Sequence, residues 1–243
     1  MTARDKVEHT RRGSMKQKLS KYILALLLVL SLIPVDVGAL SDQSLNEAFL
    51  KAVRYKDVAL MKDLLRQGAD INGADETAVT PLIFAVSAGD IKTVDFLIAE
   101  GADFEETKPF PNAPIYFAIS ENKLAIVSRL LDLGVSPNFA WPNRDEGTLL
   151  ITAVQCGHLE TVKLLVRRGA NVNYCGNGDF SPLYRSVIYD RFSIFRFLLS
   201  KGAYLNRRDK TALSELKWDK VEKDRKYIEY LKKRGSGKKM VSP

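Results

Sequence analysis

The sequence has few of the residues that carry chemistry in enzymes. Its 243 residues include two histidines, His9 and His158, and two cysteines, Cys156 and Cys175. The 19-residue separation of the cysteines matches no metal-ligand motif. A histidine without an oriented partner is a poor general base. We therefore expect no catalytic residues, no metal site and no cofactor, and these absences argue against an enzyme.

Two short patterns resemble ligand sites, but each has a simpler interpretation. Asp103, Glu105 and Glu106 form an acidic cluster, yet their spacing is not that of a calcium-binding loop. The stretch 176–178 is rich in glycine like a phosphate-binding loop, but Asn177-Gly178 is the residue pair typical of a tight hairpin turn. We interpret the cluster as a weak candidate for calcium and the stretch as a turn at a loop tip.

The sequence also lacks an apolar run long enough to cross a membrane. The run from Tyr22 to Ile33 has 12 residues, whereas a membrane-spanning helix needs about 20. Basic residues precede this run, and the small residues of Val37-Gly38-Ala39 follow it, as in a signal peptide. We predict that residues 1–39 are a signal peptide cleaved after Ala39, with no membrane contact after cleavage.

Export by this signal places the mature chain in the periplasm, and release into the medium is the alternative. Met15 opens a basic segment of its own, so translation from Met1 or from Met15 would give a signal peptide. No cysteine follows the apolar run, so a lipid anchor is not expected.

Charge is distributed unevenly along the mature chain. The net charge is −6 over residues 40–112, +3 over 113–206 and +7 over 207–243. Such asymmetry can steer the approach of a partner. The basic residues are confined to one end, and an exported protein rarely meets nucleic acid, so we do not expect a nucleic-acid partner.

A period of about 33 residues runs through the chain. It is marked by glycines with spacings of 33, 33, 35 and 33, which are Gly68, Gly101, Gly134, Gly169 and Gly202. A second marker, of the kind Thr-Pro-Leu, precedes each of the last four glycines by 21 residues. It begins at Thr80, Ala113, Thr148 and Ser181, and a fifth copy begins at Thr211. Such periods are typical of stacked structural repeats.

The repeated residues fit a pair of helices. Thr or Ser caps a helix start, and Pro suits the first helical turn. Gly89 and Gly157 then allow a tight reversal into a second helix, which has an apolar stripe such as Val94, Leu97 and Ile98. Gly101 ends that helix, and an extended loop follows.

Over residues 44–235 this pattern resembles the ankyrin repeat, whose unit is about 33 residues with a Thr-Pro-Leu-His-type opening. The best match runs from Thr148 to Asn173 and includes Gly157-His158. The resemblance implies that His158 makes a structural hydrogen bond. The opening histidine of the family is absent, since other residues stand there: Ile83, Tyr116, Ile151, Tyr184 and Ser214.

We therefore expect an all-α solenoid of six helix-turn-helix units with hairpin-like loops. The predicted units are 44–79, 80–112, 113–147, 148–180, 181–210 and 211–235, after a linker at 40–43 and before a basic flexible tail at 236–243. The first and last units are expected to be caps. Ser44 and Glu47 have the spacing of a capping box that would start the first helix.

A solenoid offers an extended surface for binding, and the repeat alignment predicts which residues line it. They end the first helix of each unit or lie in the loops, where Tyr, Trp and Arg are the residues that dominate interfaces. The candidates are Arg54, Tyr55, Phe110, Trp141, Arg144, Tyr174, Tyr189, Arg207, Arg208 and Trp218. Arg207 and Arg208 are expected in a loop and Trp218 on a helix.

The same alignment predicts that the two cysteines remain thiols. Cys156 ends a first helix and Cys175 lies at the loop tip of the same unit. About ten helical residues at 1.5 Å rise separate them by roughly 12–15 Å, beyond the ~7 Å Cα separation that a disulfide allows.

These expectations favour a monomeric periplasmic module that binds and modulates another protein. Two jobs are open: an inhibitor or immunity protein that blocks a toxin or hydrolase, and a stabiliser of an envelope enzyme. The alternative is a secreted effector that binds host proteins.

Overall fold

The computed structural model describes residues 42–104, 113–140, 147–176, 180–215, 226–227 and 229–230. The chain divides into two compact units, residues 1–43 and 44–243. The description concerns the second unit together with the two residues that start its first helix. The predicted signal peptide and the basic tail lie outside the described residues.

Within the described ranges the chain forms eleven helices. They are α2 (Asp42–Tyr55), α3 (Val58–Arg66), α4 (Pro81–Ser87), α5 (Ile91–Ala99), α6 (Pro114–Ser120), α7 (Leu124–Asp132), α8 (Leu149–Cys156), α9 (Leu159–Arg167), α10 (Pro182–Ile188), α11 (Phe192–Ser200) and α12 (Arg207–Glu215). In these ranges the extended pairing is limited to one isolated bridge between Ala140 and Thr148. The all-α prediction is confirmed.

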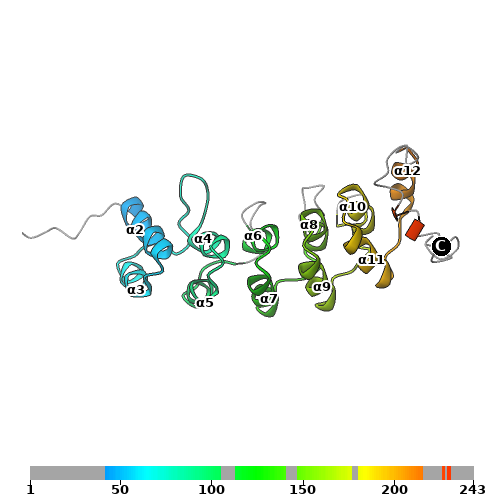
Figure 1. The fold of residues 1–243 in the computed structure, drawn as a ribbon. Coiled ribbons are helices and arrows are strands. Elements are labelled where there is room, and N and C mark those ends of the chain that lie inside the picture. Colours follow the sequence, from blue (N-terminus) through cyan, green and yellow to red (C-terminus); the bar gives the residue numbers. More distant parts are fainter. Residues whose placement is uncertain are drawn as a thin grey trace, which may run out of the picture. The chain divides into compact units, whose positions relative to one another are not determined.

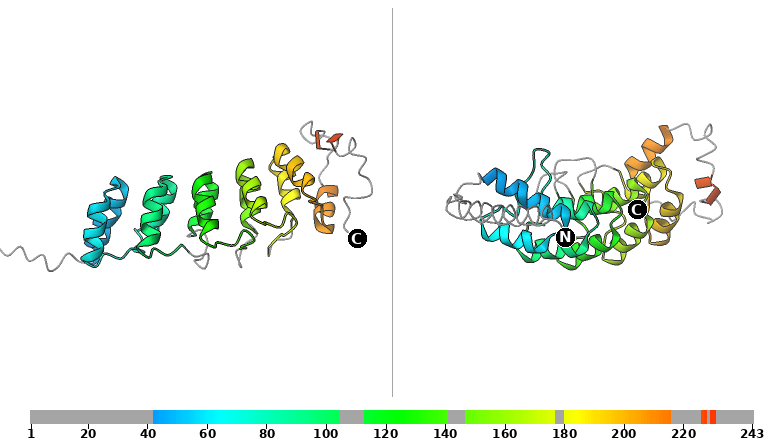
Figure 2. Two further views of the ribbon diagram at one scale, coloured as in Figure 1. Left: turned by 90° about the horizontal axis from the view of Figure 1, so that it is seen from below. Right: turned by 60° about the vertical axis from the view of Figure 1, so that its left-hand side comes forward.

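The helices form two rows (Figures 1 and 2). The first helix of each pair packs on the first helix of the next, through α4, α6, α8 and α10. The second helices α5, α7, α9 and α11 stack in the same order. We call these the first-helix row and the second-helix row, and we count α2 and α3 as their first members.

Each pair reverses through one residue in the left-handed conformation. Gly89 and Gly157 hold this position with φ of 70° and 84°, as predicted. Lys56, Asn122 and Asp190 hold the same position with φ of 55° to 58°. Asn and Asp adopt this conformation more readily than other non-glycine residues, so the strongest case for a turn imposed by the flanking helices is Lys56.

The second helices end where the glycine period predicted. The five period glycines, Gly68, Gly101, Gly134, Gly169 and Gly202, all have φ between 83° and 104°. The backbone N–H of the following residue then bonds back to the helix, for example from Ala102 to the carbonyl of Leu97 at 2.8 Å. This is the closure that a C-terminal glycine makes possible.

The predicted caps start three of the first helices. Thr80, Thr148 and Ser181 each accept a hydrogen bond from the backbone N–H three residues later, at 3.3, 3.2 and 3.1 Å. Ala113 stands at the same position of α6 and has no side chain that can cap. The start of α6 relies on Pro114, whose fixed φ suits the first turn.

One continuous apolar core joins the repeats. Each pair contributes residues from both helices, such as Leu82 and Val86 from α4 and Val94 and Leu97 from α5, all at most 1% exposed. Because burial of such side chains is the main stabilising term in folding, each repeat depends on its neighbours for stability.

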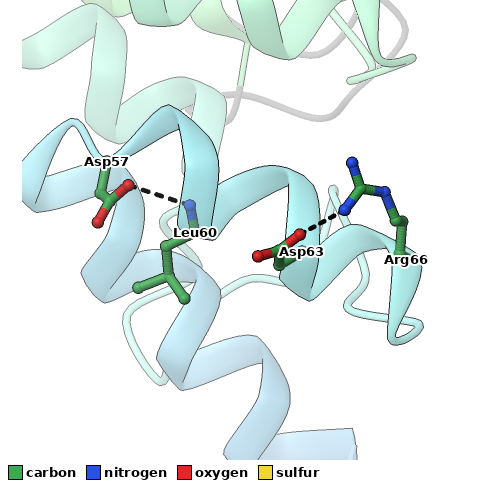
Figure 3. Close-up of polar contacts among 4 residues, drawn as sticks. All are labelled: Asp57, Leu60, Asp63 and Arg66. Carbon is green, nitrogen blue, oxygen red and sulfur yellow. Dashed lines mark hydrogen bonds and ion pairs between the residues drawn. The ribbon is translucent and has the colours of Figure 1, made fainter.

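The first repeat shows the consequence of having no described repeat before it (Figure 3). Asp57 caps α3 by accepting the N–H of Leu60 at 3.0 Å, and Asp63 pairs with Arg66. Leu60 is 43% exposed, whereas Thr93 in the same register of the next repeat is buried. Asp57 and Asp63 lie one turn before and one turn after Leu60, so charged residues flank this exposed leucine.

Two predicted helix starts are wrong. Ser44 lies inside α2, which already includes Asp42, so Ser44 and Glu47 do not form the capping box of its first turn. Thr211 lies inside α12, where its hydroxyl donates to the carbonyl of Arg207 at 3.2 Å.

The start of α12 at Arg207 has a clear physical cause. The side chain of Asn206 accepts the N–H of Asp209 at 2.8 Å, and the side chain of Asp209 accepts the N–H of Asn206 at 2.8 Å. This reciprocal pair starts the helix immediately after the fifth repeat. Arg207 and Arg208 therefore lie on a helix, and their predicted placement in a loop is wrong.

A short C-terminal segment covers the last second helix. Tyr227 is buried, and its ring lies edge-on to Phe192 and Phe195 at 5.1 and 4.9 Å. Its hydroxyl donates to the carboxylate of Asp190 at 3.0 Å, and Lys226 pairs with the same carboxylate at 2.7 Å. This contact closes the apolar core at the C-terminal side of α11.

Across the described ranges, every helix is too short or too polar to span a lipid bilayer.

Candidate functional site

Hydrogen bonds across the helix turns fix the fourth and the fifth repeat against the one before each. Nε2 of His158 lies 3.1 Å from the carbonyl oxygen of Ser120, and Arg191 donates to the carbonyl of Gln155 at 2.9 and 3.2 Å. Since His158 and Arg191 hold equivalent positions, the contact repeats at successive junctions. The structural role predicted for His158 is confirmed.

A second set of cross-repeat bonds holds the loops in register. Asn72 accepts the N–H of Asp103 at 2.8 Å, and Asn138 accepts the N–H of Asn171 at 2.7 Å. Asn173 accepts the N–H of Tyr204 at 3.0 Å. A buried or half-buried backbone N–H needs such a partner, so these asparagines set where each loop leaves its repeat.

The second-helix row also uses its charged residues between repeats. Arg129 on α7 pairs with Asp95 on α5 at 2.6 Å, and Arg168 pairs with Asp132 at the end of α7. The ammonium of Lys62 lies 5.9 Å from the ring centre of Phe96. These charged side chains therefore form contacts between repeats within the stack.

The first-helix row instead ends in exposed side chains. Tyr55 at the end of α2 is 79% exposed. At the end of α10, Ile188 is 39% exposed and Tyr189 is 41% exposed. Gln155 of α8 lies beside Tyr189, with its amide 3.5 Å from the tyrosine hydroxyl. These residues define the exposed end of the row.

Arg54 links the first two repeats on the same row. It is exposed, and its guanidinium carbon lies 5.2 Å from the ring centre of Phe84 on α4. A guanidinium over a ring in this geometry is attracted to its face. The contact holds Arg54 over α4 and presents it beside Tyr55.

The sequence reasoning missed half-buried aromatic residues on the first-helix row. Phe84 on α4 and Phe117 on α6 occupy equivalent positions, and Tyr116 packs edge-on against Phe117 at 5.8 Å. Their alignment at one repeat position, with Arg185 at the equivalent place in α10, was a signal that could have revealed them. Aromatic side chains that are half exposed are the type enriched at interfaces.

Three segments meet at the loop end of α10. Ser181 donates its N–H to Asp209 of α12 at 3.0 Å, and Asn206 donates to the sulfur of Cys175 at 3.7 Å. These bonds bring residues 174–176, 180–185 and 206–209 together. The candidates that lie there are Tyr174, which is 39% exposed, and the exposed Arg207 and Arg208.

Four of the ten candidates lie outside the described residues. They are Phe110, Trp141, Arg144 and Trp218. The predicted turn at Asn177-Gly178 and the acidic residues Glu105 and Glu106 are also outside them. For all ten candidates, a role in binding remains a prediction.

Both cysteines are thiols, and no disulfide joins them, as predicted. Cys156 is half-buried at the end of α8. Burial raises the pKa of its thiol, partly offset by the nearby charge of Arg191 and a hydrogen bond with Ser120. A raised pKa keeps the thiol protonated and poorly nucleophilic.

In the part of the chain that the structure describes, no three His, Cys, Asp or Glu side chains gather closely enough to hold a metal ion.

Comparison with known proteins agrees with the repeat geometry. A family profile described as ankyrin repeats (3 copies) matches residues 25–108, 49–140 and 115–209. An ankyrin repeat protein of Acanthamoeba polyphaga mimivirus is 34% identical over 83 residues, which are 33% of this chain and 51% of that protein. An ankyrin repeat protein of Fowlpox virus (strain NVSL) is 32% identical over 84 residues, which are 33% of this chain and 28% of that protein.

The chain therefore spans about half or less of the length of these viral relatives. The family matches cover three quarters of the chain and overlap every helix pair from α2 to α11. Ankyrin repeats are generally non-catalytic modules that bind protein partners through their stacked surface. The chain belongs to the ankyrin-repeat family.

Proposed function

We propose that this chain is an exported, non-catalytic protein that binds and modulates a protein partner in the periplasm. Support for export comes from the sequence of residues 1–39, in which a basic segment, a short apolar run and Val37-Gly38-Ala39 follow one another. Support for binding comes from the family and from the side chains exposed on the first-helix row.

The observation that carries the proposal is the contrast between the two rows. On the second-helix row, Arg129 and Arg168 are held in ion pairs between repeats. On the first-helix row, the exposed large side chains include two tyrosines, Tyr55 at 79% and Tyr189 at 41%. Those described on the second-helix row are all aliphatic: Val58, Leu60, Ile91 and Leu124. Large aromatic side chains exposed at repeated positions are what a binding surface requires, since they bury much area on contact at a low cost in conformational entropy.

The exposed side chains of the first-helix row suit a protein that modulates an envelope protein by binding to it. A monomeric stack with a rigid row of exposed side chains can block an enzyme as an inhibitor or immunity protein, or it can hold an enzyme in its folded form. Both jobs use the same surface, and neither needs a reacting group on this chain.

The test is affinity capture from an envelope extract, followed by binding measurements with the purified partner. We expect Tyr55→Ala, Trp141→Ala and Tyr189→Ala to weaken binding. As a control, Arg167→Ala replaces an exposed residue at the end of α9 on the second-helix row. Unchanged affinity in Tyr55→Ala and Tyr189→Ala would exclude the first-helix row as the binding surface, and unchanged affinity in Trp141→Ala would exclude the predicted contact of that residue.

Export is tested separately. Cell fractionation and N-terminal sequencing of the protein expressed from the full gene should give a periplasmic chain that begins at Leu40. A chain that remains in the cytosol with residues 1–39 intact would contradict the proposed location.

A further inference from the structure

The loop end of α10 carries a cluster of aromatic and basic side chains. We define the basic aromatic cluster as Tyr174, Phe180, Tyr184, Arg185, Arg207 and Arg208. Its three segments are held together by the bonds from Ser181 to Asp209 and from Asn206 to Cys175. The cluster is therefore built by tertiary contacts between the fourth repeat loop, α10 and α12.

The aromatic part of the cluster is a stack. The rings of Phe180 and Tyr184 lie 4.4 Å apart with planes within 16° of parallel. The guanidinium carbon of Arg185 lies 5.6 Å from the ring centre of Phe180. Phe180 therefore contacts both a ring and a cation, which fixes the side chains before any partner arrives. A preformed surface loses little conformational entropy on binding.

The charge of the cluster is positive. Arg207 and Arg208 are exposed in the first turn of α12, and Arg185 lies half-buried on α10. Among the described residues of the three segments, Asp209 is the acidic residue. It is buried, with one oxygen accepting the N–H of Ser181 and the other accepting the N–H of Asn206.

Asp190, at the other end of α10, is similarly occupied. Its carboxylate accepts a hydrogen bond from the hydroxyl of Tyr227 and forms an ion pair with Lys226. The described carboxylates next to α10 are thus held in internal contacts, and the side chains of Arg207 and Arg208 are exposed. An approaching molecule meets positive charge beside aromatic rings.

We propose that the basic aromatic cluster binds an acidic segment of the protein partner, one that carries carboxylates next to aromatic or aliphatic side chains. Carboxylates complement the guanidinium groups, with which they form charge-assisted and often bidentate hydrogen bonds. Apolar side chains of the same segment complement the Phe180–Tyr184 stack. This inference rests on the proposed function, and it names the chemistry of the partner and the section of the surface that contacts it.

The position along the chain supports the same assignment. The mature sequence is acidic over residues 40–112 and basic over 207–243. An acidic segment of the partner is repelled from the first repeats and attracted to the last, so the charge asymmetry orients the partner on the stack.

The test uses the protein purified from cells that express the full chain and three synthetic probes. The first is a peptide of alternating Glu and Tyr, the second has Lys in place of Glu, and the third is a single-stranded oligonucleotide. We expect the Glu-Tyr peptide to bind with an affinity that falls as salt rises, because ion pairs at a surface are screened. Its binding should shift the NMR signals of residues 174–176, 180–185 and 206–209.

Charge reversal provides the matched comparison. The double variant Arg207→Glu, Arg208→Glu should bind the Glu-Tyr peptide at least tenfold more weakly. The melting temperature of the protein should be unchanged. Lys62→Glu with Arg66→Glu on α3 makes the same charge change in the first repeat and should leave the affinity unchanged. Equal binding of the Lys-Tyr peptide, tighter binding of the oligonucleotide, or signals that shift on α2 to α4 would each overturn the inference.

Failure of this inference can be told from failure of the proposed function. Suppose that Tyr189→Ala lowers the affinity for the captured partner but the charge reversal of Arg207 and Arg208 does not. The first-helix row then binds the partner, and the proposed acidic chemistry is wrong. If neither change lowers the affinity for the captured partner, the proposed binding surface itself is wrong.

Discussion

The guanidinium group of Arg191 donates two hydrogen bonds to the carbonyl oxygen of Gln155, from Nη2 at 2.9 Å and from Nε at 3.2 Å. The two residues belong to successive repeats. The side chain passes over Gly157, where an added Cβ would lie 2.8 Å from its guanidinium carbon. A glycine at this turn thus leaves room for the contact that joins the repeats.

Loss of this contact should destabilise the stack. Arg191→Ala leaves the Gln155 carbonyl without its charged donor, and hydrogen bonds to charged groups contribute about 1.5–3 kcal/mol. We expect a loss of that size in the free energy of unfolding, measured by urea denaturation. Arg167→Ala, at an exposed position of α9, should change stability by less than about 0.5 kcal/mol. Equal effects of the two variants would show that the cross-repeat bond contributes nothing.

A missing cap offers a way to stabilise the protein. Ala113 stands where Thr80, Thr148 and Ser181 cap their helices. The N–H of Tyr116 donates to the backbone carbonyl of Ala113 at 3.0 Å, and Ala113→Ser adds a side-chain acceptor for it. Such caps contribute about 0.5–2 kcal/mol. We expect a higher melting temperature in this variant, and Thr148→Ala should give a lower one. A destabilised Ala113→Ser protein would mean that the buried site does not accommodate the hydroxyl.

The C-terminal segment should be required for the stability of the fifth repeat. Tyr227→Ala removes the buried ring that covers Phe192 and Phe195, and large-to-small changes of aromatic residues cost about 3–5 kcal/mol. Tyr227→Phe keeps the ring and removes the hydroxyl that donates to Asp190, which should cost about 1 kcal/mol. Hydrogen exchange should show α11 opening more often in Tyr227→Ala, whereas unchanged protection of α11 would argue against this role.

Asp90 should make the first repeat junction sensitive to acid. Burial raises the pKa of its carboxyl, but hydrogen bonds from Thr93 at 2.9 Å and from Lys56 at 3.3 Å outweigh burial and lower the pKa overall. A carboxyl with a lowered pKa in the folded state stabilises the protein above its ordinary pKa of about 4, and this stability is lost as pH falls through the folded value.

We therefore expect Asp90→Asn to be less stable than the unchanged protein at neutral pH. The difference should shrink as pH falls through the lowered pKa that Asp90 has in the folded protein. Urea denaturation of both proteins across this range measures it. A difference that is constant with pH would mean that the charge of Asp90 does not stabilise the junction.

The repeat period predicted most of the helix boundaries because glycine and capping residues act locally. Gly101 ends α5 and Thr148 starts α8 through contacts within a few residues. The turn at Lys56 could not be predicted in this way, because lysine rarely adopts the left-handed conformation that packing imposes on it.

The C-terminal unit shows a different limit. Thr211-Ala212-Leu213 matches the repeated marker, but Asn206 and Asp209 cap each other and start α12 earlier. Asp209 also accepts the N–H of Ser181, a contact 28 residues away that no local pattern indicates. The basic aromatic cluster depends on this contact. Tyr174, Arg207 and Arg208 were candidates from the sequence, whereas Phe180, Tyr184 and Arg185 were added to the cluster only by the structure.

The central claim is that the first-helix row binds the partner and the second-helix row does not. Ile188 on α10 and Ile91 on α5 allow a direct test, because both are isoleucines with similar exposure, 39% and 37%. The affinity of the captured partner should fall at least tenfold in Ile188→Ala and stay unchanged in Ile91→Ala. A loss in Ile91→Ala with none in Ile188→Ala would contradict the account.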